Sequence, residues 1–385
     1  MLFLKKLEKL EVTSAVSFMA FLLLLPVFTG VGKVNNIFHL SIASMLIYMI
    51  ALRKNPFALD YNYKKGLAVV FSFLIYYSLT NLWSDNPANI ESTLKHSLYF
   101  MFFILMFNHC IKRYGILKVH LLIFLGCFSL LCLTILFVDK STILINRLNH
   151  GFLYAPSNVI DLGGYFAIGI ISGLIVARES GRHWIYLPAA LLFIGLLLTQ
   201  SRGPLLALLV SLIVLFAKYK NVHIRHVVYI CLSISIIALF FYFTDYGNEF
   251  YARIILSYKQ SFIRFGIWDF SFREGLAHPI LGWGFDKEIN FINSIGQHVT
   301  TTHSVYFSAF LKGGIIGVIF LSAVIIVSLM QAYKKYHQGL GLEASAYLFS
   351  IIFFITQGMF VIGGPGEAWM LFWLPLAMVM STQRK

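Results

Sequence analysis

Three positions in this sequence combine a chemically useful side chain with a suitable setting: Arg202, Arg264 and His303. Arg202 lies in the polar segment TQSRGP, which separates two strongly apolar runs. Gly203-Pro204 follows and favours a helix start, because proline fits the first helical position without losing a hydrogen bond. A helix N-terminus offers free N–H groups and a partial positive charge. Arg202 beside such a terminus is a candidate anion site, and phosphate commonly binds there.

Arg264 is the second candidate, in the segment RFGIWDFSFREGLAHPILGWGF. Trp268 follows four residues later, so on a helix the two side chains share one face. An arginine beside an aromatic ring at a membrane surface can hold an anionic headgroup. The alternative is that Arg264 only anchors its segment to lipid phosphates. For Arg202 the alternative is an arginine at a turn whose charged end reaches the membrane interface.

His303 precedes an apolar run in the segment TTTHSVYFSAFLKGGIIG. A neutral imidazole there can take a proton from a hydroxyl group. The alternative is a hydrogen-bonded interfacial histidine, and His278 and His298 compete for the same role. We find no metal-ligand spacing, no Gly-rich phosphate loop and no Ser-His-Asp arrangement. The sequence therefore predicts a phosphate-handling site without metal or cofactor, in which arginines supply the positive charge.

The elements that must position these residues are membrane helices. Of the 385 residues 59% are hydrophobic and 12% are charged, against roughly a quarter charged in soluble domains. Apolar runs long enough to cross a bilayer recur along the chain, and we expect about twelve spans of about 20 residues. They lie at 13–30, 35–52, 65–82, 94–111, 117–138, 158–177, 183–199, 203–217, 226–243, 304–332, 343–361 and 367–381. This predicts an all-α polytopic membrane protein with one transmembrane domain, residues 1–385.

The net charge of +14 is explained by topology. Most lysines and arginines fall between the spans on one side, which is the positive-inside pattern. The pattern predicts that both termini are cytoplasmic, and it argues against nucleic acid as the partner. The N-terminal segment resembles a signal peptide, but its apolar run has spanning length and no cleavage site stands out, so we expect an uncleaved first span.

One outer segment is long, residues 244–302 between the ninth and tenth expected spans. Long ordered loops usually carry function. Its first part, from Phe250 to about Gly275, is amphipathic and is expected to form a helix in the membrane interface. Pro279, Gly282 and Gly284 then break regular structure.

Two further features of the expected spans and loops bear on the site. The polar stretch NRLNHGFLYAPSNVID, before the sixth span, contributes Arg147, Asn158 and Asp161. Lys312 lies inside the tenth span, where it could pair with an acid such as Glu367 or Glu274. Gly313, Gly314 and Gly317 are explained by close helix packing.

Four of these pieces, in order, resemble a known family: RLNHGFLYAPSN, TQSRGPLLAL, RFGIWDFSFREGLAHPILGWGF and HSVYFSAFLKGGIIG. The chain resembles the O-antigen ligase superfamily, which also contains O-antigen polymerases and O-oligosaccharyltransferases. The resemblance covers about residues 147–317. It implies a GT-C-type membrane glycosyltransferase in the inner membrane of a Gram-negative bacterium, with a periplasmic active site. The donor would be O-antigen on undecaprenyl diphosphate, and the acceptor a sugar of lipid A–core.

The resemblance also implies residue roles. Arg202 and Arg264 would hold the donor diphosphate, and His303 would act on the acceptor hydroxyl, in an inverting transfer without metal or nucleotide. The residues expected to bind substrate are Ser201, Trp268, Tyr306, Arg147 and Asn158.

The sequence departs from the family at two places. Lys312 stands where many relatives carry an acid, which puts any role of that position in doubt. Ser157 separates Pro156 from Asn158, which weakens Asn158 as a donor-site residue. An O-antigen polymerase remains the alternative within the family. A polysaccharide or lipid transporter is the alternative of another class, although that would predict charge in mid-membrane.

Overall fold

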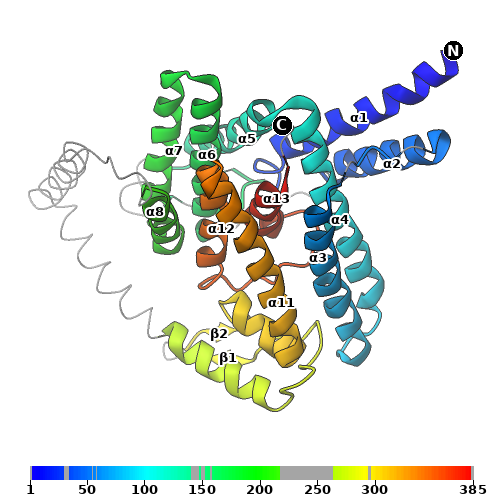
Figure 1. The fold of residues 1–385 in the computed structure, drawn as a ribbon. Coiled ribbons are helices and arrows are strands. Elements are labelled where there is room, and N and C mark those ends of the chain that lie inside the picture. The colour runs from blue at the N-terminus through cyan, green and yellow to red at the C-terminus, as the bar shows by residue number, and fades with distance from the viewer. Residues whose placement is uncertain are drawn as a thin grey trace, which may run out of the picture.

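The computed structural model describes residues 2–29, 34–53, 55–57, 59–139, 147–148, 152–156, 158–216, 263–293 and 296–382. This part of the chain is mostly helical (Figure 1). The α-helices are α1 (Leu2–Leu24), α2 (Asn35–Leu52), α3 (Tyr61–Leu79), α4 (Asn89–Tyr114), α5 (Ile116–Phe137), α6 (Val159–Ser180), α7 (Tyr186–Leu198), α8 (Arg202–Phe216), α11 (Val305–His337), α12 (Gly341–Phe353) and α13 (Leu374–Met380). A further helix covers residues 263–276. The expected ninth span, 226–243, lies outside the described residues.

Six of these helices are long and apolar enough to cross a membrane: Asn35–Leu52, Tyr61–Trp83, Asn89–Tyr114, Ile116–Phe137, Val159–Ser180 and Val305–His337. Four shorter apolar helices accompany them, His183–Leu198, Arg202–Leu215, Gly341–Phe353 and Trp369–Met380. Large apolar side chains are exposed on the helix surfaces, among them Ile50 (76%), Leu136 (62%) and Ile213 (65%). Such surfaces are unusual in water and suit lipid. The chain is an integral membrane protein, and the count of twelve spans stays a prediction.

Capping side chains explain where α3 and α6 begin. The side chain of Asp60 accepts a hydrogen bond from the N–H of Tyr63 at 2.7 Å, which caps α3. The side chain of Asn158 accepts one from the N–H of Ile160 at 2.9 Å, which caps α6. These side chains satisfy N–H groups that have no partner within the helix.

The expected span 343–361 is shorter in the structure, because α12 ends at Phe353. Residues 354–368 form a glycine-containing connection that leads into a π-helix, η4 (Trp369–Trp373). Gly363-Gly364-Pro365-Gly366 lies in this connection and disfavours helix, since glycine costs backbone entropy and proline lacks the N–H group. The second half of the expected span is therefore wrong.

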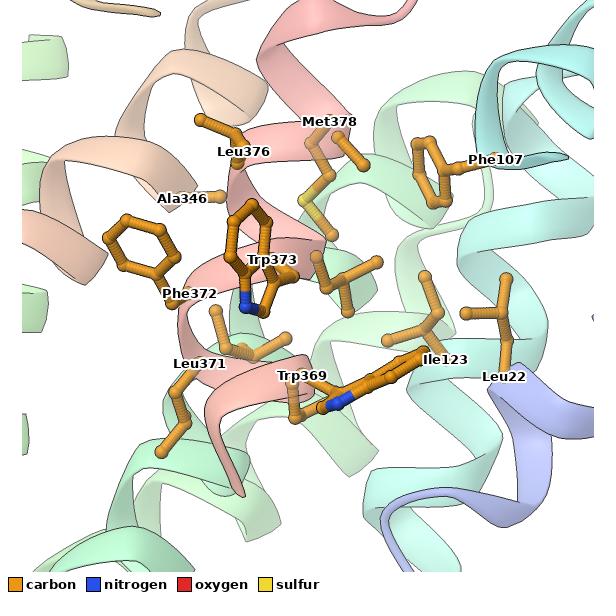
Figure 2. Packing of buried hydrophobic residues seen from close by; sticks show 14 of the residues in the cluster. Leu22, Phe107, Ile123, Ala346, Trp369, Leu371, Phe372, Trp373, Leu376 and Met378 are labelled. Atoms are coloured by element: carbon orange, nitrogen blue, oxygen red, sulfur yellow. The ribbon is translucent and has the colours of Figure 1, made fainter. Parts of the chain in front are cut away.

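The core surrounds the π-helix (Figure 2). Trp369 and Trp373 are both fully buried, and Phe100 of α4 stacks on Trp373 with ring centroids 4.2 Å apart. The indole N–H groups donate to the connection that precedes them: Trp373 to the carbonyl of Val361 at 2.6 Å, and Trp369 to that of Gly363 at 3.1 Å. The core thereby fixes the end of the 354–368 connection.

Helix α11 is broken at Gly314, which has φ 59° and ψ −160°. Its neighbour across the break is the HPILGWGF segment of the long loop. The carbonyl of Leu311 accepts from the N–H of Trp283 at 2.9 Å. Beyond the break, the N–H of Ile315 donates to the carbonyl of Pro279 at 2.8 Å. The loop thus supplies hydrogen bonds that the helix has lost, so Gly314 marks a break rather than helix packing.

Gly313 and Gly317 do serve packing, as expected. A Cβ at Gly313 would lie 2.9 Å from the ring of Tyr77 in α3, and one at Gly317 would lie 3.0 Å from the same ring. The hydroxyl of Tyr77 donates to the carbonyl of Ala309 at 3.0 Å. The two helices therefore approach closely beside the break.

Lys312 bonds to backbone carbonyl groups of the long loop. Its ammonium donates to the backbone carbonyls of Phe285 and Lys287, the latter at 2.9 Å. The expected acid Glu274 instead pairs with Lys287 at 2.8 Å. Lys312 therefore holds the long loop against α11 through carbonyl groups.

Helix 263–276 and a short hairpin, β1 (Phe291–Ile292) and β2 (His298–Val299), lie together beside the start of α11 (Figure 1). The strands are antiparallel, with Phe291 opposite Val299. Ile267, Ile289, Val299 and Leu311 form a small buried cluster between them. Of the helix expected from Phe250 to about Gly275, the part from 263 onward is observed, up to residue 276, and the earlier part lies outside the described residues. The hairpin is not expected from the sequence.

Candidate functional site

The turn between α7 and α8 is held by Arg147. Its guanidinium donates from Nε to the carbonyl of Thr199 at 3.1 Å and from Nη2 to Oγ of Ser201 at 3.0 Å. Ser201 is buried, and its hydroxyl donates to the carbonyl of Val159 at 3.2 Å. Gln200 adopts a left-handed φ of 51°, which non-glycine residues rarely adopt. Arg147 and Ser201 are thus brought together, and they fix the backbone from which Arg202 projects.

Arg202 is the first residue of α8, and its side chain is exposed. The helix start expected at Gly203-Pro204 is confirmed to within one residue. A Cβ at Gly203 would lie 3.1 Å from Oγ1 of Thr356, so the N-terminus of α8 rests against the 354–368 connection. Arg202 therefore stands beside a helix N-terminus, as an anion site requires.

His303 lies two residues before the start of α11 and is half-buried. Its φ of 48° lies in the left-handed region. A Cβ at Gly358 would lie 2.5 Å from the backbone nitrogen of His303 and 2.7 Å from its Cα, so the two backbones are in direct contact. Next to it, Oγ1 of Thr302 and Oγ of Ser308 are 2.7 Å apart. The His303 backbone is fixed by tertiary contacts in a conformation that costs about 1 kcal/mol or more.

Arg264 lies in helix 263–276 and is half-buried. Burial lowers its pKa, and the structure shows no hydrogen bond or ion pair between Arg264 and any other described residue. Burial also lowers the pKa of His303, and the positive charge of Arg264 lowers it further. Arg264 and His303, separate in sequence, therefore interact electrostatically. Both effects favour the neutral imidazole, so His303 can accept a proton while the cation of Arg264 faces an anion.

Three further predicted residues have structural contacts of their own. The ring of Trp268 stacks on Phe307 of α11, with centroids 5.6 Å apart and planes at 22°. The hydroxyl of Tyr306 donates to the carbonyl of Ile351 at 2.7 Å. Asn158 caps α6, as described above. These contacts position helix 263–276, α11 and α6, and a role of the three side chains in substrate binding stays a prediction.

The competing histidines lie elsewhere on the long loop. His278 is exposed and packs against the ring of Trp283, with centroids 4.0 Å apart. His298 is exposed, and its Nε2 lies 2.6 Å from Oδ1 of Asn290. His303, in contrast, is half-buried against the 354–368 connection, which makes it the better-placed candidate base.

Sequence reasoning missed the turn Thr356-Gln357-Gly358. Thr356 packs against Gly203 beside Arg202, and Gly358 packs against His303. Between them, Nε2 of Gln357 donates to Oδ1 of Asp161 in the first turn of α6. The turn therefore links the elements that carry three parts of the predicted site. A signal was present, since Thr-Gln-Gly interrupts the apolar run FFITQGMFVI.

Comparison with known proteins adds an independent observation. Residues 187–322 match the family model described as O-Antigen ligase. The chain is 26% identical over 244 residues to an O-antigen ligase of Pseudomonas aeruginosa. The aligned region covers 59% of this chain and 58% of that relative. The chain is similar to O-antigen ligases. The expected resemblance is thereby confirmed, and the stretch that matches the O-antigen ligase model contains Arg202, Arg264 and His303.

Proposed function

We propose that this chain is an O-antigen ligase, a glycosyltransferase of lipopolysaccharide biosynthesis. It transfers O-antigen polysaccharide from undecaprenyl diphosphate to a sugar of lipid A–core. The observation that carries the proposal is the linkage of Arg202, Arg264 and His303: the charge of Arg264 acts on His303, and the turn 356–358 contacts both Gly203 and His303. The family match over 187–322 supports it, because that match spans all three residues.

The proposed reaction is a direct displacement. The oxygen of an acceptor hydroxyl attacks the anomeric carbon of the donor from the face opposite the diphosphate. The bond between that carbon and the phosphate oxygen breaks, its electron pair leaves with undecaprenyl diphosphate, and the configuration inverts. His303 takes the hydroxyl proton, for which its imidazole must be neutral at the start. The lowered pKa of His303 favours that form.

Positive charge for the leaving diphosphate comes from the protein in this scheme. Arg202 and Arg264 form charge-assisted hydrogen bonds with phosphate oxygens, which are stronger than bonds between neutral groups. The N-terminus of α8 adds its partial positive charge. Groups fixed in place before charge develops stabilise a transition state effectively. We therefore propose a metal-independent transfer within a GT-C-type membrane fold.

The proposed location is the inner membrane of a Gram-negative bacterium, with both termini in the cytoplasm and the site on the periplasmic side. Support comes from the distribution of basic residues, which gather in the connections on the opposite side of the expected spans from Arg202 and His303. The donor and acceptor are lipid-anchored, so a site at the membrane surface suits both.

The test is reconstitution of the full chain in liposomes with undecaprenyl-diphosphate-linked O-antigen. One reaction contains lipid A–core and the other contains donor alone, both with EDTA and without ATP. Capped lipopolysaccharide in the first reaction is the expected product. Chain growth on the donor alone would instead indicate a polymerase, and the absence of both products would point to transport. Loss of capping in EDTA, restored by a divalent metal, would contradict the metal-independent scheme.

A further inference from the structure

We propose, building on the function proposed above, that Asp161 and Gln357 form a positioning pair that holds His303 and Arg202 in register. Gln357 donates from Nε2 to Oδ1 of Asp161 across 196 positions of sequence. Both side chains are buried, each with 3% of the residue exposed. The loss of either partner leaves the other buried and without its hydrogen bond, which is costly for a buried polar group.

The neighbours of Gln357 explain what the pair positions. Thr356 lies against Gly203, the residue after Arg202, and Gly358 lies against the backbone of His303. Successive Cα atoms are about 3.8 Å apart across a planar peptide, so a movement of Gln357 is passed directly to both neighbours. One side chain thereby sets the separation between the cation at the start of α8 and the base before α11.

Asp161 is a suitable fixed point for this connection. It lies in the first turn of α6, whose backbone is fixed by regular helical hydrogen bonds. Helix α6 is buried along most of its length, and its neighbours include α5, α7, α8 and α12. The connection itself lacks regular helix over residues 354–366, so its backbone needs a tether between the ends fixed by α12 and by the core tryptophans.

The burial of Asp161 argues against a direct role in the reaction. Its Oδ1 is occupied by Gln357, and only 3% of the residue is exposed. A catalytic residue must touch the reacting atoms, and Asp161 reaches them only through the turn. It is therefore a positioning residue.

An isosteric exchange tests the pair. Gln357→Glu places two carboxyl groups against each other and removes the donor, so we expect the capping rate to fall about a hundredfold, as an ångström-scale misplacement can cause. Adding Asp161→Asn restores a hydrogen bond with reversed direction and unchanged shape. The capping rate of the double variant is expected to recover to within about tenfold of wild type. Together with the two single variants it forms a double-mutant cycle, which measures the coupling between the two residues. No recovery, or no loss in Gln357→Glu, would overturn the proposal.

A second comparison uses glycines of the same connection. In Gly358→Ala the new methyl group meets the His303 backbone, whereas nothing lies within 4 Å of a Cβ at Gly363. We expect Gly358→Ala to lose capping about tenfold or more and Gly363→Ala to retain it. Equal activity of the two variants would contradict the proposed contact.

A readout without catalysis separates this inference from the proposed function. The reactivity of His303 toward diethylpyrocarbonate, followed by peptide mass spectrometry across pH, reports the environment of its ring in the full chain. Gln357→Glu is expected to change that profile and the double variant to restore it, even if the wild type caps no lipopolysaccharide. An unchanged profile in Gln357→Glu would overturn the positioning role while leaving the ligase proposal intact.

Discussion

Replacing Gly314 with alanine should separate the two halves of α11 from the loop that bridges them. Gly314 has φ 59° and ψ −160°, a region that is essentially open only to glycine. An added Cβ would overlap the carbonyl of Ile280 and lie 2.7 Å from the backbone nitrogen of Gly282. Real Cβ atoms essentially never come so close to other atoms, so the loop must move away from the helix.

The cost of Gly314→Ala has two parts. An unsuitable backbone conformation costs about 1 to 3 kcal/mol. Movement of the loop also weakens the bonds from Trp283 to Leu311 and from Ile315 to Pro279, at about 1 kcal/mol each. We therefore expect a destabilisation of about 3 to 5 kcal/mol.

Thermal unfolding of the purified protein in detergent, followed by tryptophan fluorescence, measures this effect. Gly314→Ala should lower Tm by about 4 to 6 °C, and Gly363→Ala, with open space around its Cβ, is the matched control. Gly282→Ala acts on the same contact from the other side, so the double variant should be less destabilised than the sum of the two. A Tm equal to that of the Gly363→Ala control would refute the assigned role of the break.

Three other predictions concern the site. Capping should persist below pH 6.5, the ordinary histidine pKa being about 6.5, and should fall only as His303 becomes protonated. Arg264→Gln removes a nearby positive charge and should therefore raise the pKa of His303. The pH midpoint for modification of His303 by diethylpyrocarbonate should rise accordingly. Arg202→Ala and Arg264→Ala should each lower capping about a hundredfold or more at normal expression. Lysine at either position should restore only part of the capping activity. Full activity of an alanine variant would remove that arginine from the mechanism. Arg147→Ala leaves Thr199 and Ser201 without their guanidinium partner, and a loss of about 1 to 3 kcal/mol should appear as a lower Tm.

The helices that carry the candidate site could be predicted from the sequence because their signals are local. Gly203-Pro204 marked the start of α8, and the apolar run after His303 marked α11. The helix at 263–276 follows from an amphipathic pattern that needs no tertiary information. Each of these elements satisfies most of its own backbone hydrogen bonds, so propensity and periodicity are sufficient to place it.

The remaining parts depend on contacts that no local pattern encodes. The break at Gly314 is bridged by backbone hydrogen bonds to the long loop, among them those of Pro279 and Trp283. The turn at Gln357 hydrogen-bonds to a side chain 196 positions away. In the sequence, Gly314 looked like a packing residue, and the 356–358 turn looked like part of a span. The polar segment TQSRGP located the turn between α7 and α8, and a similar interruption of an apolar run by Thr-Gln-Gly was the signal for the missed turn.

The left-handed residues Gln200 and His303 give a physical reason why the candidate site is built on connections rather than inside helices. A regular helix cannot hold a non-glycine residue in that conformation, and the conformation costs free energy unless surrounding contacts impose it. Here Arg147 holds the α7–α8 turn in that conformation through Thr199 and Ser201, and Gly358 packs against the backbone of His303.

Asparagine tolerates left-handed φ better than alanine, so His303→Asn removes the base with less disturbance of the backbone than His303→Ala. If His303→Asn loses capping while its Tm stays at the wild-type value, the loss reports chemistry; if Tm falls equally in both variants, the imidazole itself contributes to the fold.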